Sequence, residues 1–218
     1  MVTKIKKVSL IFCSAALVFA AAGCVGSADP VEPTPTASNP TATASSSPPT
    51  TSSSPSIKPT PKPIPASSTG PAKNWPVPVM PDAAKKNTEA GIKAFTEHYY
   101  ELVEYTIQTN DTKPIKKVSK RTCLECGNVF IDPFDNNKKA GSWMTGAEFN
   151  VTVTRAILQL PQGISLYTTT QGEMNLFMSD GTLQGTFPAT PKPAPLMMIL
   201  RFDRGWMVES VEYLDEDS

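Results

Sequence analysis

A run rich in proline, serine and threonine limits how much of this chain can fold. Between residues 25 and 72 these three residue types occupy 31 of 48 positions, and 12 of the chain's 22 prolines lie there. Such a segment cannot bury enough apolar surface to offset its loss of chain entropy, so we expect a disordered linker. About 145 of the 218 residues remain, which is enough for one domain with a hydrophobic core.

The first 23 residues have the parts of an export signal. A basic segment comes first, formed by Lys4, Lys6 and Lys7. The uncharged apolar run at residues 8–20 has 13 residues, whereas a membrane-spanning helix needs about 20. A run of this length is typical of a signal peptide. It leads into Ala-Ala-Gly-Cys at residues 21–24, which resembles the lipobox of bacterial lipoproteins and implies that Cys24 becomes an acylated N-terminus.

The chain is therefore expected to have three parts. These are a signal peptide over residues 1–23, a lipidated Cys24 followed by the linker up to residue 74, and a globular domain over residues 75–218. One acyl chain alone gives only marginal membrane binding, whereas two give a stable anchor. Diacylation at Cys24 would therefore hold the domain stably on the outer face of the cell membrane. The alternative is cleavage after the small residues 20–22, which would release a secreted protein.

Residues 88–109 carry the apolar stripe of a long helix. Side chains that can face a core recur three and four positions apart at Ile92, Phe95, Tyr99, Leu102, Val103 and Thr106. The spacing predicts a helix that begins after Thr88 and ends near Thr109, where Asn110 and Asp111 interrupt it.

Two shorter helical stretches are predicted after the long helix. The first has Pro114 in its first turn, where the missing N–H of proline does no harm. The second begins near Cys123 and is expected to end at Pro133. Trp143 and Gly146 are then assigned to a turn.

From residue 149 the apolar pattern alternates, as it does in half-buried strands. The alternation predicts strands over residues 149–154, 165–178, 196–202 and 206–214. A long loop is expected over residues 179–195, and Gly205 is expected to take a left-handed conformation in the last hairpin. Helices followed by antiparallel strands indicate an α+β fold, in which the long helix packs on a curved sheet of about four strands.

Several short motifs resemble an uncharacterised family of actinobacterial lipoprotein domains. They are the segments 75–81 and 88–95, Tyr99-Tyr100, the turn at residues 109–112, Cys123-x-x-Cys126 and Trp143-x-x-Gly146. The resemblance covers roughly residues 75–215. Its turn usually reads Thr-Gly-Asp, and Asn110, which also tolerates a left-handed conformation, replaces the glycine. The order of elements is similar to the cone of nuclear transport factor 2-like and cystatin-like folds, so the resemblance implies a fold and a location but no chemistry.

Cys123 and Cys126 are the two cysteines that would remain after export and acylation. Two cysteines in an oxidising compartment favour a disulfide. We interpret the pair as a short structural staple between helices, because no strand precedes it as in thioredoxin-like proteins. The alternative is a reactive pair, since basic residues at 116–121 would favour a thiolate. Two cysteines supply only half of a tetrahedral zinc site, so no metal is expected.

His98 is the single histidine of the chain and would be the natural general base in a cone-shaped active site. It lies at the edge of the apolar stripe, which predicts a partly exposed side chain. The sequence places no carboxylate to orient it, and Glu97, Glu101 and Glu104 are expected on a solvated face. We therefore give the enzyme hypothesis based on His98 little weight.

Four aromatic residues could line a pocket between the long helix and the sheet, namely Phe95, Tyr99, Trp143 and Trp206, and Phe149 and Phe202 are further candidates. Aromatic residues at such spacings more often form plain core. The equal numbers of basic and acidic residues, 20 each, disfavour a nucleic-acid binder. We expect a non-catalytic envelope domain without a cofactor that binds a partner protein or a small apolar ligand. A thiol–disulfide oxidoreductase that uses Cys123 and Cys126 is the alternative.

Overall fold

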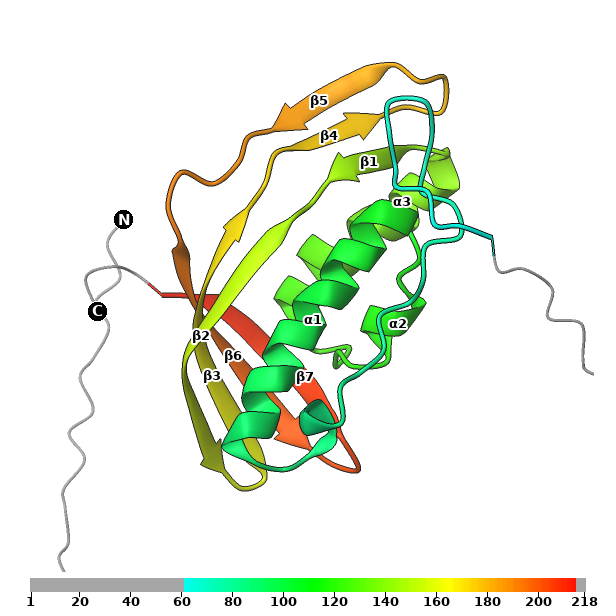
Figure 1. Ribbon diagram of the computed structural model, residues 1–218. Coiled ribbons are helices and arrows are strands. Elements are labelled where there is room, and N and C mark those ends of the chain that lie inside the picture. The colour runs from blue at the N-terminus through cyan, green and yellow to red at the C-terminus, as the bar shows by residue number, and fades with distance from the viewer. Residues whose placement is uncertain (1–60, 215–218) are drawn as a thin grey trace, which may run out of the picture. The chain divides into compact units, whose positions relative to one another are not determined.

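One long helix lies across a strongly curved antiparallel sheet in the computed structural model, which describes residues 61–214 (Figure 1). The predicted signal peptide, Cys24 and the linker up to residue 60 lie outside the described residues. The α+β prediction is confirmed, because helices pack on one side of antiparallel strands. Within residues 61–214, no helix combines the length and the apolarity that a bilayer crossing requires.

The long helix α1, Glu89–Thr109, begins and ends close to the predicted residues. The side chain of Thr88 accepts a hydrogen bond of 3.0 Å from the backbone N–H of Gly91, which caps the helix. Asn110 ends it in a left-handed conformation with φ 54°, and its N–H donates to the carbonyl of Thr106. The cap and the stripe together account for the accurate prediction of α1.

Shorter helices surround α1. They are η1 (Ala83–Lys85), α2 (Lys113–Lys116), the π-helical η2 (Cys126–Ile131) and α3 (Asp132–Ala140). Pro114 lies in the first turn of α2, as predicted. The predicted break at Pro133 is wrong, because the helical path continues from η2 into α3. Pro133 is the second residue of α3, and in a first turn its missing N–H leaves no hydrogen bond unmade.

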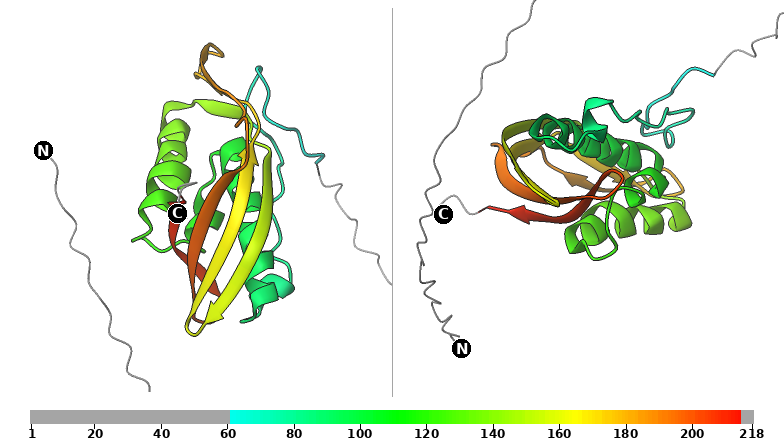
Figure 2. Two further views of the ribbon diagram at one scale, coloured as in Figure 1. Left: turned by 90° about the vertical axis from the view of Figure 1, so that its left-hand side faces the viewer. Right: turned by 90° about the horizontal axis from the view of Figure 1, so that it is seen from below.

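The strands form two antiparallel sheets. The larger has the order β2-β3-β6-β7, with β2 Phe149–Gln159, β3 Gln162–Gln171, β6 Ala194–Phe202 and β7 Trp206–Tyr213. The smaller has the order β1-β4-β5, with β1 Trp143–Gly146, β4 Met174–Phe177 and β5 Leu183–Phe187. Two residues separate β1 from β2, and two separate β3 from β4, so the smaller sheet continues the larger one beyond a bend (Figure 2).

This bend explains three errors of the strand prediction. The expected single strand over 165–178 is interrupted at residues 172–173 and contributes β3 to one sheet and β4 to the other. The expected loop over 179–195 contains β5. Trp143 and Gly146 belong to strand β1, not to a turn, although Gly146 has a positive φ of 85° at its end.

Two further differences concern turns and boundaries. In the hairpin between β6 and β7 the left-handed residue is Arg204, with φ 55°, and not Gly205. Residues 64–73, expected in the linker, form a small hairpin in which Ile64 and Lys73 pair. This hairpin is attached to the end of α1, because the N–H of Ala66 donates to Gln108 Oε1 over 3.1 Å. The folded part therefore begins before residue 75.

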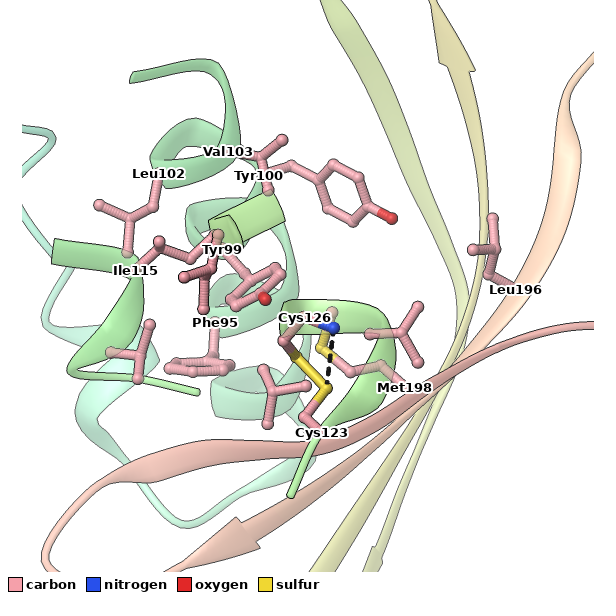
Figure 3. Close-up of a cluster of buried hydrophobic side chains, with 14 of the residues drawn as sticks. Phe95, Tyr99, Tyr100, Leu102, Val103, Ile115, Cys123, Cys126, Leu196 and Met198 are labelled. Atoms are coloured by element: carbon pink, nitrogen blue, oxygen red, sulfur yellow. Dashed lines mark hydrogen bonds between the residues drawn. A yellow bond between two sulfur atoms is a disulfide. The ribbon is translucent and has the colours of Figure 1, made fainter. Parts of the chain in front are cut away.

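The core lies between α1 and the concave face of the larger sheet (Figure 3). Its fully buried side chains include Ile92, Phe95, Tyr99, Val103, Ile115, Met198, Leu200 and Val208. Gly163 on β3 approaches α1 so closely that a Cβ there would lie 2.7 Å from Cδ1 of Ile92. This close approach fixes the start of α1 against the sheet.

Candidate functional site

A small hollow opens between α1, η2 and the end of the larger sheet. Six of the side chains that line it are Tyr100, Val129, Phe130, Phe149, Leu196 and Tyr213. We call it the Tyr100 hollow. Its volume is about 110 Å³. Figure 3 shows Tyr100 pointing from α1 toward the strand that carries Leu196.

An aromatic cluster forms the floor of the Tyr100 hollow. The ring of Tyr100 lies 5.5 Å from that of Phe149, 6.3 Å from that of Phe130 and 5.6 Å from that of Tyr167. The hydroxyls of Tyr100 and Tyr167 are hydrogen-bonded to each other over 3.0 Å. Burial raises the pKa of Tyr100 to about 12 and that of Tyr167 still further. Both hydroxyls therefore stay protonated at physiological pH, and the floor is uncharged.

The rim of the Tyr100 hollow exposes apolar surface. Val129, on η2, is 43% exposed and Tyr213, at the end of β7, is 69% exposed. The irregular π-helical turn presents Val129 and Phe130 to the sheet, and such turns often occur at functional sites. Of this set, sequence analysis named only Phe149 as a pocket residue, because the members come from α1, η2, β2, β6 and β7, and no local pattern connects them.

The size of the Tyr100 hollow limits what it can accept. A cavity of about 150 Å³ holds one benzene molecule, and sites for drug-sized ligands span about 300–1,000 Å³. A hollow of about 110 Å³ therefore fits one apolar group, such as a leucine or methionine side chain. Seven of the ten lining residues are aromatic or aliphatic, and Thr169, Gln171 and Thr190 add polar groups. Because the Tyr100 hydroxyl is already paired and no lining residue carries a charge, the Tyr100 hollow favours an apolar occupant.

Cys123 and Cys126 form a disulfide, as predicted. The two residues are 2% and 0% exposed, and the N–H of Cys126 donates to Sγ of Cys123 over 3.2 Å (Figure 3). The disulfide thus closes the turn that leads into η2. A redox-active disulfide must be reachable by a thiolate of its partner, and burial works against that attack.

The predictions for His98 and its neighbours are wrong in two respects. His98 is only 3% exposed, and its Nδ1 lies 2.9 Å from Oε2 of Glu101, so a carboxylate does orient it. Glu104 accepts a hydrogen bond from the backbone N–H of Phe149. Glu104 is half-buried, so it does not lie on a freely solvated face, and desolvation of its carboxylate raises its pKa.

The four aromatic residues proposed to line one pocket lie in different places. Phe95 and Tyr99 are completely buried in the core. Trp143 stacks on Phe177 of β4, and its ring N–H donates to the carbonyl of Ser67. Trp206 packs edge to face on Phe202, near the opposite end of α1. The structure therefore does not bring these four side chains together around one pocket.

The motif at residues 109–112 ties the end of α1 to its neighbours. Asn110 Nδ2 donates to the carbonyl of Ser142 over 2.8 Å, beside the start of β1. The hydroxyl of Thr112 donates to Asp135 of α3 over 2.6 Å. Among residues 61–214, no group of three or more metal-binding side chains lies close enough to hold an ion. Its hydrogen bonds to Ser142 and Asp135 make this motif part of the scaffold.

The family model that matches the chain describes a family of unknown function (DUF6318) and covers residues 62–212. The chain belongs to this family. The match begins at the small hairpin and ends in β7, so it covers nearly all of the described fold. The match confirms the prediction that this chain belongs to an uncharacterised family. No curated protein matches the chain.

Two solved structures show distant likenesses to the DUF6318 chain. One is the crystal structure of the intermembrane space region of chloroplast protein ARC6, with a TM-score of 0.45 and 9% identity over 59% of this chain and 98% of that one. The other is a nuclear transport factor 2-like chain named Rd1NTF2_05, with a TM-score of 0.32 and 9% identity over 56% of this chain and 99% of that one.

Proposed function

We propose that this DUF6318 chain is a lipid-anchored, extracytoplasmic domain of an actinobacterial cell envelope that binds a partner protein or small ligand without catalysis. The observation that carries the binding role is the Tyr100 hollow, where exposed apolar side chains surround an uncharged aromatic floor. Apolar anchors that fill a small pocket dominate the binding energy of many protein interfaces. The volume favours such an anchor from a partner protein over a free ligand.

The surroundings of the Tyr100 hollow support a non-catalytic role. The hydroxyl of Tyr100 is already paired with that of Tyr167, and burial raises the pKa of Tyr100, so this hydroxyl is not a ready base. His98 is held by Glu101 and is not among the residues that line the hollow. A general acid–base reaction would need a titratable group at the bound molecule.

The envelope location rests on the sequence of residues 1–24. Export would place Cys123 and Cys126 where disulfides persist, which agrees with the disulfide that they form. The anchor is tested by feeding cells an alkyne-tagged fatty acid and comparing the wild type with Cys24→Ser. We expect the label and the membrane-bound fraction to be lost in the variant. Equal labelling of both would refute lipidation at Cys24.

The binding role is tested by placing a photo-reactive phenylalanine analogue at Val129 in living cells. This rim position is partly exposed, so the substitution should be tolerated. Val79, which is 85% exposed and does not line the hollow, is the matched control position. We expect a discrete adduct of protein size from position 129 that position 79 does not give, and Tyr213→Asp should abolish it.

The mass of the adduct separates the occupants. An adduct heavier by a small molecule would indicate a free apolar ligand in place of a protein anchor. If position 129 gave no more crosslinked adduct than position 79 while both proteins were folded and exported, the Tyr100 hollow would be refuted as a binding site.

The alternative function, a thiol–disulfide oxidoreductase, has one observation in its favour. Cys123 lies against a hollow whose rim carries Lys116, Lys120 and Arg121, and cations stabilise a thiolate. The burial of both cysteines argues against it. We expect the folded chain to resist dithiothreitol at concentrations that reduce exposed disulfides, and rapid reduction without unfolding would favour the oxidoreductase.

A further inference from the structure

A second and larger hollow lies between α2, the disulfide turn and the start of α3. Its volume is about 460 Å³, within the range of small-molecule sites, which is about 300–1,000 Å³. The side chains that matter for its chemistry are Lys116, Ser119, Lys120, Arg121 and Asp132. We call it the Arg121 hollow. It shares no lining residue with the Tyr100 hollow.

The local chain path keeps the Arg121 hollow open and its rim fixed. Gly127 lines it without a side chain, and a Cβ built there would meet nothing nearer than a carboxylate oxygen of Asp132 at 3.9 Å. The N–H of Lys120 donates to the carbonyl of Val208, and that of Cys123 donates to the carbonyl of Lys120. These hydrogen bonds and the disulfide fix the backbone before and after Arg121.

Two lysines at the rim are held in place by carboxylates. Lys116 Nζ donates to Asp135 Oδ2 over 2.6 Å, and Lys120 Nζ donates to Glu209. The hydrogen bond from Lys120 keeps the pKa of Glu209 below its usual value. Desolvation would raise the pKa of Asp135, but the hydrogen bonds from Lys116 and Thr112 outweigh it and lower the pKa. Both carboxylates therefore stay ionised, and each ammonium group keeps further N–H donors for a ligand.

Arg121 differs from these lysines. It is exposed and makes no hydrogen bond or ion pair with any residue of the described part of the chain. A guanidinium group presents a planar fork of donors that matches a carboxylate or a phosphate. Asp132, which also lines the hollow, likewise has no hydrogen bond from a side chain and offers acceptors only.

We propose that the Arg121 hollow binds a compact polar molecule that carries an anionic group together with hydroxyl or ammonium donors. Arg121 binds the anionic group, with Lys116 and Lys120 beside it, and Asp132 accepts from the donors. Because Asp132, Asp135 and Glu209 offset the three cations, a bare anion gains little there. The charge arrangement thus selects for a molecule with both kinds of group.

The proposal is tested by calorimetric titration of the full chain in detergent. The probes are glucosamine 6-phosphate, glucuronate, glucose and inorganic phosphate. The first two carry an anionic group and donors, glucose lacks the anion, and inorganic phosphate lacks the sugar donors. We expect glucosamine 6-phosphate, glucuronate or both to bind at least about tenfold more tightly than glucose and than inorganic phosphate, the ratio that one charge-assisted hydrogen bond supplies. Which of the two binds distinguishes a phosphate from a carboxylate.

Two variants assign the binding to this hollow. Arg121→Gln should weaken it about tenfold or more, whereas Lys113→Gln removes an equal charge from α2 outside the hollow and should leave it nearly unchanged. Both are exposed substitutions, and unchanged melting temperatures will show that the fold is intact. The proposal would be overturned if neither glucosamine 6-phosphate nor glucuronate bound, or if inorganic phosphate bound as tightly as they do. Equal losses of binding in the two variants would also overturn it.

Discussion

A single methyl group added at Gly91 tests how α1 is seated against the rest of the fold. Gly91 lies in the first turn of α1 and is buried. A Cβ at this position would lie 1.9 Å from the carbonyl oxygen of Lys86 and 3.0 Å from its carbon. Both are backbone atoms, which cannot rotate away as a side chain can. The Lys86 carbonyl must therefore move if residue 91 is alanine.

Moving that carbonyl breaks two contacts. Its oxygen accepts from the backbone N–H of Thr88 over 3.0 Å and from the ring N–H of Trp206 over 2.9 Å. Trp206 is only 3% exposed, so its donor would be left unpaired at a cost of about 1–3 kcal/mol. The bond from Thr88 contributes about 1 kcal/mol more. Alanine gains about 1 kcal/mol over glycine through its helix propensity, so we expect Gly91→Ala to lower the free energy of unfolding by about 2 kcal/mol net.

Urea and thermal unfolding of the full chain, followed by circular dichroism, measure this loss. For a domain of this size about 2 kcal/mol corresponds to a fall in Tm of about 4–8 °C. The matched control is Gly185→Ala on β5, where a Cβ meets no atom within 4 Å, and this variant should unfold within about 1 kcal/mol of the wild type. If Gly91→Ala were as stable as the wild type while the control behaved as expected, the position of the Lys86 carbonyl would be wrong.

Three further predictions follow from contacts that can be removed singly. Thr88→Ala removes the cap of α1 and should cost about 1 kcal/mol in urea unfolding, with Thr88→Ser as a control that keeps the acceptor. Tyr100→Phe and Tyr167→Phe each leave a buried hydroxyl unpaired and should cost about 1–3 kcal/mol, whereas the double variant should cost less than the sum; strict additivity would contradict the bond. Because desolvation raises the pKa of Glu104 above 4.5, the folded state holds its proton more tightly than the unfolded state does. Its contribution to stability therefore falls as pH rises from 4.5 through the raised pKa, and Glu104→Gln should remove that part of the slope in Tm measured from about pH 4 to 8.

The helical half of the fold could be predicted because its signals are local. The stripe of α1 repeats every three to four residues, and both ends carry capping residues within the same stretch of sequence. Pro133 misled the prediction, because proline ends a helix when it lies in the interior but is tolerated in a first turn. The sequence does not show which case applies unless the start of α3 is already known.

The strands of the smaller sheet were missed for a different reason. The residues of β5 are almost all exposed, so the strand has no alternation between buried and exposed side chains from which to predict it. The break between β3 and β4 is likewise set by the bend, which is a property of the whole sheet. His98 was misplaced because a helical wheel of α1 alone leaves out segments that pack beside the helix from elsewhere in the chain. Residues 75–79 lie beside Glu101 and Tyr105, three and seven positions after His98 on α1.

The sequence motifs contribute both to the scaffold and to the two hollows, since Tyr100 lines one hollow and Cys123 lines the other. Asn110, Thr112 and Trp143 hold α1, α3, β1 and the linker hairpin together through specific hydrogen bonds. Val129 and Arg121, which distinguish the two hollows, lie outside the recognised motifs. A chain can keep every scaffold contact and still change the size of one hollow or the charge of the other by a single exposed substitution. The contacts that hold this fold together therefore do not determine what occupies the hollows, and the occupants have to be measured directly.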